Sequence, residues 1–227
     1  MKVFWLLPLV LVGSLLGAPL KGPLMQVEDV EGLPRVLLIG DSISMGYTLQ
    51  VRELLKGKAN VHRPPTNCGP TIKGLASLDD WLKVGGEGKK WEVIHFNWGL
   101  HDLKYMGPNG QNLADPKAKT SRRQVPPVEY EKNLRELVKR LKKTGARLIW
   151  RNTTPVPEGA RGRVPGDSAK YNEIASKIMK EEGVGVHDLY SYALKNAAKI
   201  QRKADVHYTR EGSSALAAEV VKAINLK

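Results

Sequence analysis

The sequence contains a single cysteine, Cys68, and few aromatic residues, which make up 6% of the chain. One cysteine cannot form an internal disulfide, and structural zinc sites need several cysteine or histidine ligands at short spacing. Internal repeats and low-complexity tracts are also absent from the sequence. The 227 residues, of which 41% are hydrophobic, suffice to bury one sizeable core. We therefore expect a globular protein that uses neither a disulfide nor a metal.

The sequence has fewer acidic than basic residues: it contains 23 Asp and Glu and 36 Lys and Arg, so the net charge is +13. Lysines and arginines over 132–143 are scattered without interleaved aromatic residues, and no nucleic-acid recognition motif accompanies them. We expect no nucleic-acid partner. A solvated basic surface of this kind favours anionic polymers.

Long hydrophobic runs are missing except at the amino terminus. Lys2 precedes the apolar run Val3–Leu16, and small residues follow at 17 and 18. The run is too short for a membrane-spanning helix, which needs about 20 residues. Residues 1–18 are therefore predicted to be a signal peptide and 19–227 a single domain, secreted or periplasmic, without stable membrane insertion after cleavage. An uncleaved anchor is the alternative.

Short apolar runs alternate with amphipathic stretches along the rest of the chain. Strands are predicted over Arg35–Gly40, Ala59–Arg63, Trp91–Phe96, Arg147–Arg151 and Val184–Asp188. Helices are predicted over Thr48–Lys56, Leu75–Val84, 126–145, from 167 or 168 to about 178, and over Glu211–Ile224. This alternation indicates a parallel sheet covered by helices on both faces, with ligand sites beyond the carboxyl ends of the strands. Lys104–Val125 is the longest irregular segment.

Ser42 lies just after the first predicted strand, in Gly40-Asp41-Ser42-Ile43-Ser44. Backbone amides at the start of a following helix would face a developing anion there, so Ser42 is a candidate nucleophile; a helix N-cap is the alternative. A serine needs a base, and His207 precedes the last predicted helix, with Asp205 two residues earlier. An exposed loop histidine is the alternative for His207.

Four segments in this order resemble the conserved blocks of the SGNH or GDSL hydrolases. They are Gly40-Asp41-Ser42, Asn67-Cys68-Gly69, Asn97-Trp98-Gly99-Leu100-His101-Asp102, and Asp205 with His207. The resemblance spans most of the chain after the leader. It implies a three-layer, flavodoxin-like α/β fold with a central five-stranded parallel sheet. It also implies a cofactor-free serine esterase with Ser42 as nucleophile and His207 as base.

The resemblance further implies an oxyanion hole made by the backbone N–H groups of Ser42 and Gly69 and one side chain. That side chain is usually an asparagine, but His101 occupies its place, so either His101 or Asn97 would donate. Gly74 is the alternative to Gly69. Asp102 is expected to brace the loops around Ser42.

The last block also departs from the family pattern, in which the acid lies three residues before the histidine. Ala204 occupies that place and Asp205 follows it, so Asp205 can serve as the triad acid only if the loop bends. The segments 104–125 and 152–157 are expected to form the pocket wall. His187 and Asp188 are expected to fix a loop.

The resulting hypothesis is an exported serine esterase that removes small acyl groups, chiefly acetyl, from a small-molecule or polysaccharide substrate. Thioesterase or lysophospholipase activity is an alternative within the same fold. A non-catalytic carbohydrate-binding module is the alternative from another class. The oligomeric state stays open.

Overall fold

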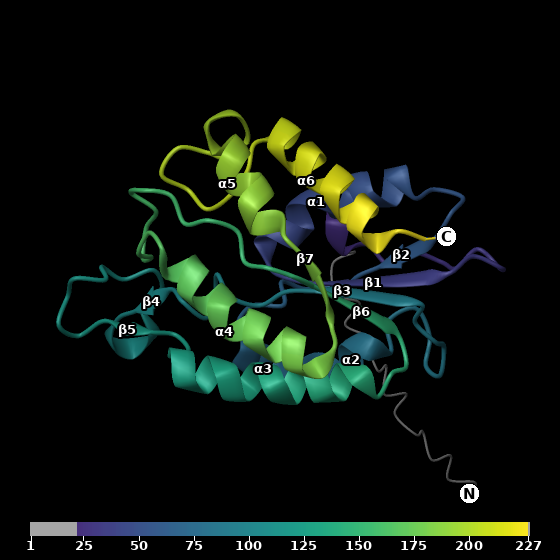
Figure 1. The fold of residues 1–227 in the computed structure, drawn as a ribbon, viewed down its shortest axis with the longest axis horizontal. Coiled ribbons are helices and arrows are strands. Elements are labelled where there is room, and N and C mark those ends of the chain that lie inside the picture. Colours follow the sequence, from purple (N-terminus) through teal and green to yellow (C-terminus); the bar gives the residue numbers. More distant parts are fainter. Residues whose placement is uncertain (1–21, 227) are drawn as a thin grey trace, which may run out of the picture.

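The computed structural model describes residues 22–226, and the predicted signal peptide lies outside them. Five parallel strands form the central sheet in the order β2-β1-β3-β6-β7 (Figure 1). Their bounds are β1 (Arg35–Ile39), β2 (Asn60–His62), β3 (Val93–Phe96), β6 (Arg147–Arg151) and β7 (Gly185–His187). This is the flavodoxin-like order. The predicted fold class is confirmed.

Helices cover both faces of the sheet and make three layers (Figure 1). One face carries α1 (Ser42–Leu54), α5 (Leu189–Ile200) and α6 (Arg210–Ile224); the other carries α2 (Thr71–Leu82), α3 (Pro127–Lys142) and α4 (Asp167–Glu182). Two short 3-10 turns, η1 (Gly22–Leu24) and η2 (Pro108–Gly110), complete the helical segments. Within 22–226, no helix is both long and apolar enough to cross a bilayer.

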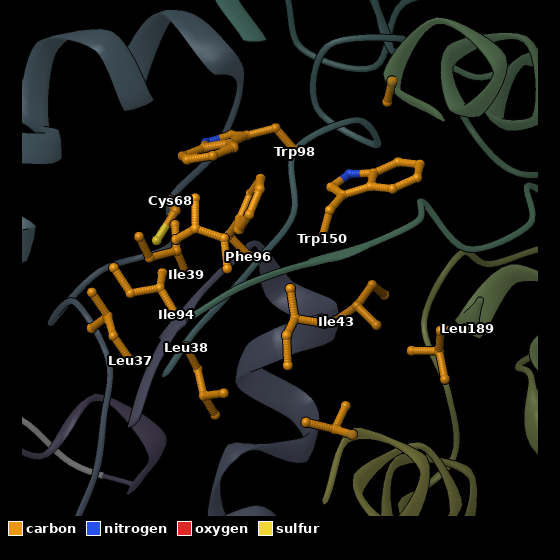
Figure 2. Packing of buried hydrophobic residues seen from close by; sticks show 14 of the residues in the cluster. Leu37, Leu38, Ile39, Ile43, Cys68, Ile94, Phe96, Trp98, Trp150 and Leu189 are labelled. Atoms are coloured by element: carbon orange, nitrogen blue, oxygen red, sulfur yellow. The ribbon is translucent and has the colours of Figure 1, made fainter. Parts of the chain in front are cut away.

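The core lies around β1, all of whose residues are buried. Figure 2 shows Leu37, Leu38 and Ile39 of β1 packed with Ile94 and Phe96 of β3. A strand in the middle of a covered parallel sheet meets apolar neighbours on both faces, so its sequence is a continuous apolar run. This burial holds the end of β1, and hence the turn to Ser42, in a fixed position.

Two helices differ most from the sequence prediction. α1 begins at Ser42, six residues before the predicted start, because Asp41 has extended backbone and its side chain accepts a hydrogen bond from the Ile43 amide at 3.0 Å. α5, which the sequence analysis did not assign, begins after Asp188, whose carboxylate accepts from the Ser191 amide at 3.0 Å. Both starts are marked by an aspartate cap.

The segment Lys104–Val125, predicted to be irregular, contains a small antiparallel hairpin. Its strands are β4 (Tyr105–Met106) and β5 (Arg122–Arg123). Arg123 pairs at 2.8 Å with the fully buried Asp167 at the start of α4, and the Tyr105 amide donates to the Gly162 carbonyl at 2.8 Å. The hairpin is thereby attached to the loop that precedes α4.

Candidate active site

The candidate site lies at the carboxyl edge of the sheet, where the chain leaves β1 and β3. The Asn97 amide donates to the Ile39 carbonyl at 3.0 Å, and the Cys68 amide donates to the Gly40 carbonyl at 3.2 Å. These two bonds hold the loops after β2 and β3 against the turn that carries Ser42. β1 is the strand at which the connections reverse direction across the sheet, and such switch points are where open α/β sheets bind ligands.

Ser42, His207 and Asp205 form one hydrogen-bonded chain. Ser42 Oγ lies 2.8 Å from His207 Nε2, and His207 Nδ1 lies 2.6 Å from Asp205 Oδ1. The two residues at the ends of this chain are 163 positions apart in sequence order, so the contact is produced by the fold. The arrangement has the geometry of a Ser–His–Asp triad.

The loop between α5 and α6 bends so that Asp205 reaches the ring despite its short spacing. Ala204 adopts a left-handed backbone conformation with φ of 52°, and Asp205 Oδ1 also accepts from the His207 backbone amide at 3.1 Å. The Arg202 amide donates to the His207 carbonyl at 3.0 Å. Asp205 therefore contacts the His207 ring although Ala204 occupies the position where the family usually has its acid.

Asp205 is held in its ionised form. Burial opposes ionisation, but the hydrogen bonds from the backbone and ring of His207 outweigh it and lower the pKa of Asp205 below its ordinary value. A carboxylate at this place orients the imidazole and leaves Nε2 to accept from the serine hydroxyl.

A small cavity of about 220 Å³ adjoins the serine and the histidine. Its walls include Ile43 and Gly46 from the first turns of α1, Tyr208 from the loop before α6, and Ser213 from the first turn of α6. This cavity has room for a short group bound at Ser42.

Two backbone amides near Ser42 bear on the predicted oxyanion hole. Ser42 is the first residue of α1, so its own N–H has no acceptor within the helix. Gly69 has a left-handed φ of 60°, and its N–H donates to the side chain of Asn67 at 2.9 Å. The side-chain oxygen of Asn67 thus accepts from the amide that was expected to meet the oxyanion.

Gly74 is not available as the alternative donor. It lies inside α2, where its amide donates to the Pro70 carbonyl at 3.2 Å. The indole of Trp98 fills the space beside its α-carbon. This assigns Gly74 to helix packing and leaves Gly69 as the glycine of the second block.

Asn97, one of two side chains expected to meet the oxyanion, is engaged elsewhere. Its amide nitrogen donates to the Arg151 carbonyl at 2.7 Å and to Thr153 Oγ1 at 3.2 Å, and its oxygen accepts from the Arg151 guanidinium at 2.6 Å. Asn97 is 1% exposed. The expectation that it could reach the site is corrected, because β6 binds this amide.

His101 remains as the candidate side chain. Burial, reinforced by the positive charges of Lys104, Arg163 and Lys73, lowers the pKa of His101 to about 4, although Asp41 opposes the shift. The imidazole is therefore neutral near pH 7. Lys104 Nζ lies 3.5 Å from Nδ1, and an ammonium group can only donate, so this contact favours the tautomer with the proton on Nε2. Within residues 22–226, Nε2 has no hydrogen-bond partner.

Asp102 lies where a bracing residue was predicted. Its Oδ1 accepts from the Thr71 amide at 2.8 Å and from the Thr71 hydroxyl at 2.5 Å, which joins the loop after β3 to the first turn of α2. Complete burial raises the pKa of Asp102 to about 7, and the bonds from Thr71 only partly offset this.

Sequence reasoning missed two fully buried arginines beneath the site. Arg63 donates to the Gly40 carbonyl at 3.2 Å and to Thr48 Oγ1 at 2.9 Å, and Arg151 lies 3.8 Å from the carboxylate of Asp41. Each arginine ends a predicted buried strand, where a charged residue must find partners beyond the sheet edge. That position was the available signal.

The remaining side chains have structural surroundings. Burial raises the pKa of the Cys68 thiol to about 11, which disfavours the nucleophilic thiolate. Asp188 caps α5 and accepts from the Asn152 amide at 2.6 Å, in keeping with the loop-fixing role predicted for it. Within residues 22–226, no group of three or more His, Cys, Asp or Glu side chains is arranged to hold a metal ion.

The flavodoxin-like sheet and the hydrogen-bonded serine, histidine and aspartate at its carboxyl edge define a hydrolase of the SGNH type. The chain belongs to the GDSL-like lipase/acylhydrolase family, whose model matches residues 38–215. No curated protein sequence matches the chain significantly.

Solved structures share the fold at low sequence identity. The acetyl xylan esterase AlAXEase is 18% identical with a TM-score of 0.64, over 84% of this chain and 100% of its own. Axe2, an acetylxylan esterase from Geobacillus stearothermophilus, is 19% identical with a TM-score of 0.64, over 89% and 98%. A lipase/acylhydrolase from Enterococcus faecalis is 18% identical with a TM-score of 0.64, over 85% and 95%.

Proposed function

We propose that the protein is a serine esterase that removes short acyl groups, chiefly acetyl, from hydroxyl oxygens of a carbohydrate. The observation that carries the proposal is the chain from Ser42 Oγ through His207 to Asp205, with distances of 2.8 and 2.6 Å. Membership of the GDSL-like family supports hydrolase chemistry at this place.

In the proposed reaction, Ser42 Oγ attacks the ester carbonyl while His207 Nε2 accepts its proton. The carbonyl oxygen becomes an anion that meets the amide of Ser42, the amide of Gly69 once Asn67 releases it, and Nε2–H of His101. The intermediate collapses, and His207 passes the proton to the departing sugar oxygen. Water, deprotonated by His207, then attacks the acyl-serine and releases the carboxylate, restoring Ser42.

The preference for a short acyl group rests on the cavity beside Ser42. Its volume of about 220 Å³ suits an acetyl group better than a long acyl chain. The acetyl xylan esterases that share this fold support a carbohydrate ester as substrate. Lysophospholipase or thioesterase activity would need room for a larger leaving group or acyl chain.

Hydrolysis of p-nitrophenyl acetate, butyrate and octanoate by the protein and its Ser42→Ala and His207→Ala variants tests the proposal. We expect acetate to be preferred and both variants to lose at least about 1000-fold in kcat. Ser214→Ala, at an exposed serine of α6, is the matched control and should retain activity. Hydrolysis that survives in both variants, or a preference for octanoate, would contradict the proposal.

We also propose export, on the basis of the amino-terminal sequence pattern. The mass of the protein recovered from the extracytoplasmic fraction should correspond to cleavage close to Ala18. Recovery of full-length protein from the membrane would instead identify an uncleaved anchor.

A further inference from the structure

Positive side chains lie close to His101. Lys104 contacts the His101 ring, and the Nε of Arg163 donates to the Leu100 carbonyl at 3.0 Å. Burial lowers the pKa of Lys104, and the neighbouring charge of Arg163 lowers it further, although Asp102 opposes this. Two like charges are therefore held close together beside the candidate oxyanion donor.

Lys104 is buried without a salt-bridge partner among the described residues. Its residue is only 7% exposed, and within residues 22–226 the sole polar partner of Nζ is His101 Nδ1 at 3.5 Å. No carboxylate of the described chain lies within 4 Å of its ammonium group or of the Arg163 guanidinium. Holding a buried cation without a partner is costly, and a bound anion would offset part of that cost.

The terminal nitrogens of Arg163 are left for a ligand. Within the described residues they make no hydrogen bond, and the side chain lines a cavity of about 580 Å³ between the segments 111–117 and 159–165. Arg161 and Lys117 line the same cavity, in which Asp115 is the only acidic residue. Clefts lined by one sign of charge attract ligands of the other sign.

This cavity adjoins the loop that carries the triad acid and base. A β-carbon added to Gly159 in its wall would lie 3.0 Å from the β-carbon of Ala204, the residue before Asp205. Arg163 is also close enough to Asp41 and Asp205 for both carboxylates to act on its pKa. A chain bound in the cavity would therefore lie next to the loop that carries Asp205 and His207.

We propose that Lys104 and Arg163 form an anion-binding subsite that selects an acidic polysaccharide as substrate. The recognised group is a carboxylate or sulfate on a sugar near the acylated one. A guanidinium group binds such planar or forked oxygens with two parallel hydrogen bonds, and the ammonium group adds a point charge. The substrate assignment rests on the proposed esterase function, but the subsite can be measured without turnover.

Binding to the Ser42→Ala protein, measured by calorimetry, tests the subsite directly. The ligands are tetragalacturonate, a sulfated xylotetraose, and neutral xylotetraose. We expect at least tenfold tighter binding of one or both anionic ligands than of the neutral one, with affinity falling as salt rises. The tighter of the two anionic ligands identifies the group recognised.

Adding Arg163→Gln to this protein should weaken anionic binding at least tenfold and leave neutral binding nearly unchanged. Arg135→Gln, on α3, removes the same charge at a residue that does not line the cavity and serves as the control. Equal affinity for the anionic and neutral ligands, or unaltered anionic binding after Arg163→Gln, would overturn the subsite.

Turnover separates this subsite from a general electrostatic effect on the reaction. Arg163→Gln in the active protein should lower kcat/KM for acetylated oligogalacturonate at least tenfold more than for p-nitrophenyl acetate. Equal losses on both substrates would overturn the proposal, because Arg163 would then act on the carbonyl of any ester. Failure of the esterase function has a different signature: no hydrolysis of either ester, with anionic binding intact.

Discussion

At the residue level, the position of Asp205 determines whether the chain has a complete triad. The backbone turn at Ala204, with φ of 52°, costs conformational energy, and the two hydrogen bonds that Asp205 makes with His207 offset that cost. Shortening the usual spacing by one residue thus leaves the acid in contact with the imidazole.

Replacing Asp205 with asparagine should lower kcat for p-nitrophenyl acetate by about 100-fold to 10,000-fold, since an amide no longer fixes the tautomer of His207 or stabilises its protonated form. The measurement is steady-state kinetics at pH 8, with circular dichroism to verify folding. Glu211→Gln, two residues into α6, is the charge-matched control. Undiminished kcat in Asp205→Asn would mean that another group orients His207.

His101 allows a second test at the same level. His101→Ala should lower kcat by about 100-fold with little change in KM, because an oxyanion donor acts on the transition state. His101→Asn restores an amide donor and should recover part of the loss. If both variants keep the original kcat, the oxyanion is held by backbone amides alone.

At the level of elements, the start of α6 positions the catalytic histidine. The Thr209 side chain accepts from the Gly212 amide at 2.9 Å and caps the helix two residues after His207. A bridge between Gln201 and Tyr208 closes the base of the loop. The helix end and the bridge together keep His207 next to Ser42.

Thr209→Ala removes this cap and should lower the free energy of unfolding by about 1 kcal/mol. Thr209→Ser keeps a hydroxyl at the same place and should retain most of the stability. Urea denaturation of the two variants measures the difference. The idea fails if alanine and serine destabilise the protein equally, because the methyl group rather than the hydrogen bond would then matter.

Sequence patterns located the regular elements well where burial was continuous. β6 was predicted with its observed bounds, and β1 and β3 differ from prediction only at their ends. The first turns of α1 and the hairpin β4–β5 escaped prediction. The first turns of α1 contain serines and a glycine, so they lack the apolar spacing that predicts a helix. The hairpin depends on contacts with the loop before α4, which local sequence patterns do not reveal.

At the level of the whole molecule, a buried pair of histidines in the sheet should make the free energy of unfolding depend on pH. His95 Nε2 on β3 lies 3.0 Å from His187 Nδ1 on β7, across β6. Burial lowers the pKa of His187 to about 4 and that of His95 well below its ordinary value of 6.5. Both rings are neutral in the folded protein, while in the unfolded chain they take up protons below about pH 6.5.

Stability should therefore fall as the pH drops from 6.5 toward 4, because the unfolded chain binds more protons than the folded protein in this range. Each histidine contributes about 1.4 kcal/mol per pH unit. His187→Gln should make the decline shallower by about that slope, as measured by urea unfolding at pH 6.5, 5.5 and 4.5. Asp102, with its raised pKa, acts in the opposite direction but equally in both proteins. Parallel stability curves for the two proteins would exclude the linkage.

The amino-acid sequence by itself determined the layered α/β architecture and located Ser42, Gly69 and His207. Buried parallel strands appear as apolar runs, and loops after such strands carry site residues. Only the tertiary structure showed that Asp205 reaches His207, that Asn97 is bound to β6, and that Lys104 and Arg163 lie close together with no salt-bridge partner among residues 22–226. Each of these depends on distances between residues far apart in the chain or on a backbone turn, and such distances arise when the core packs.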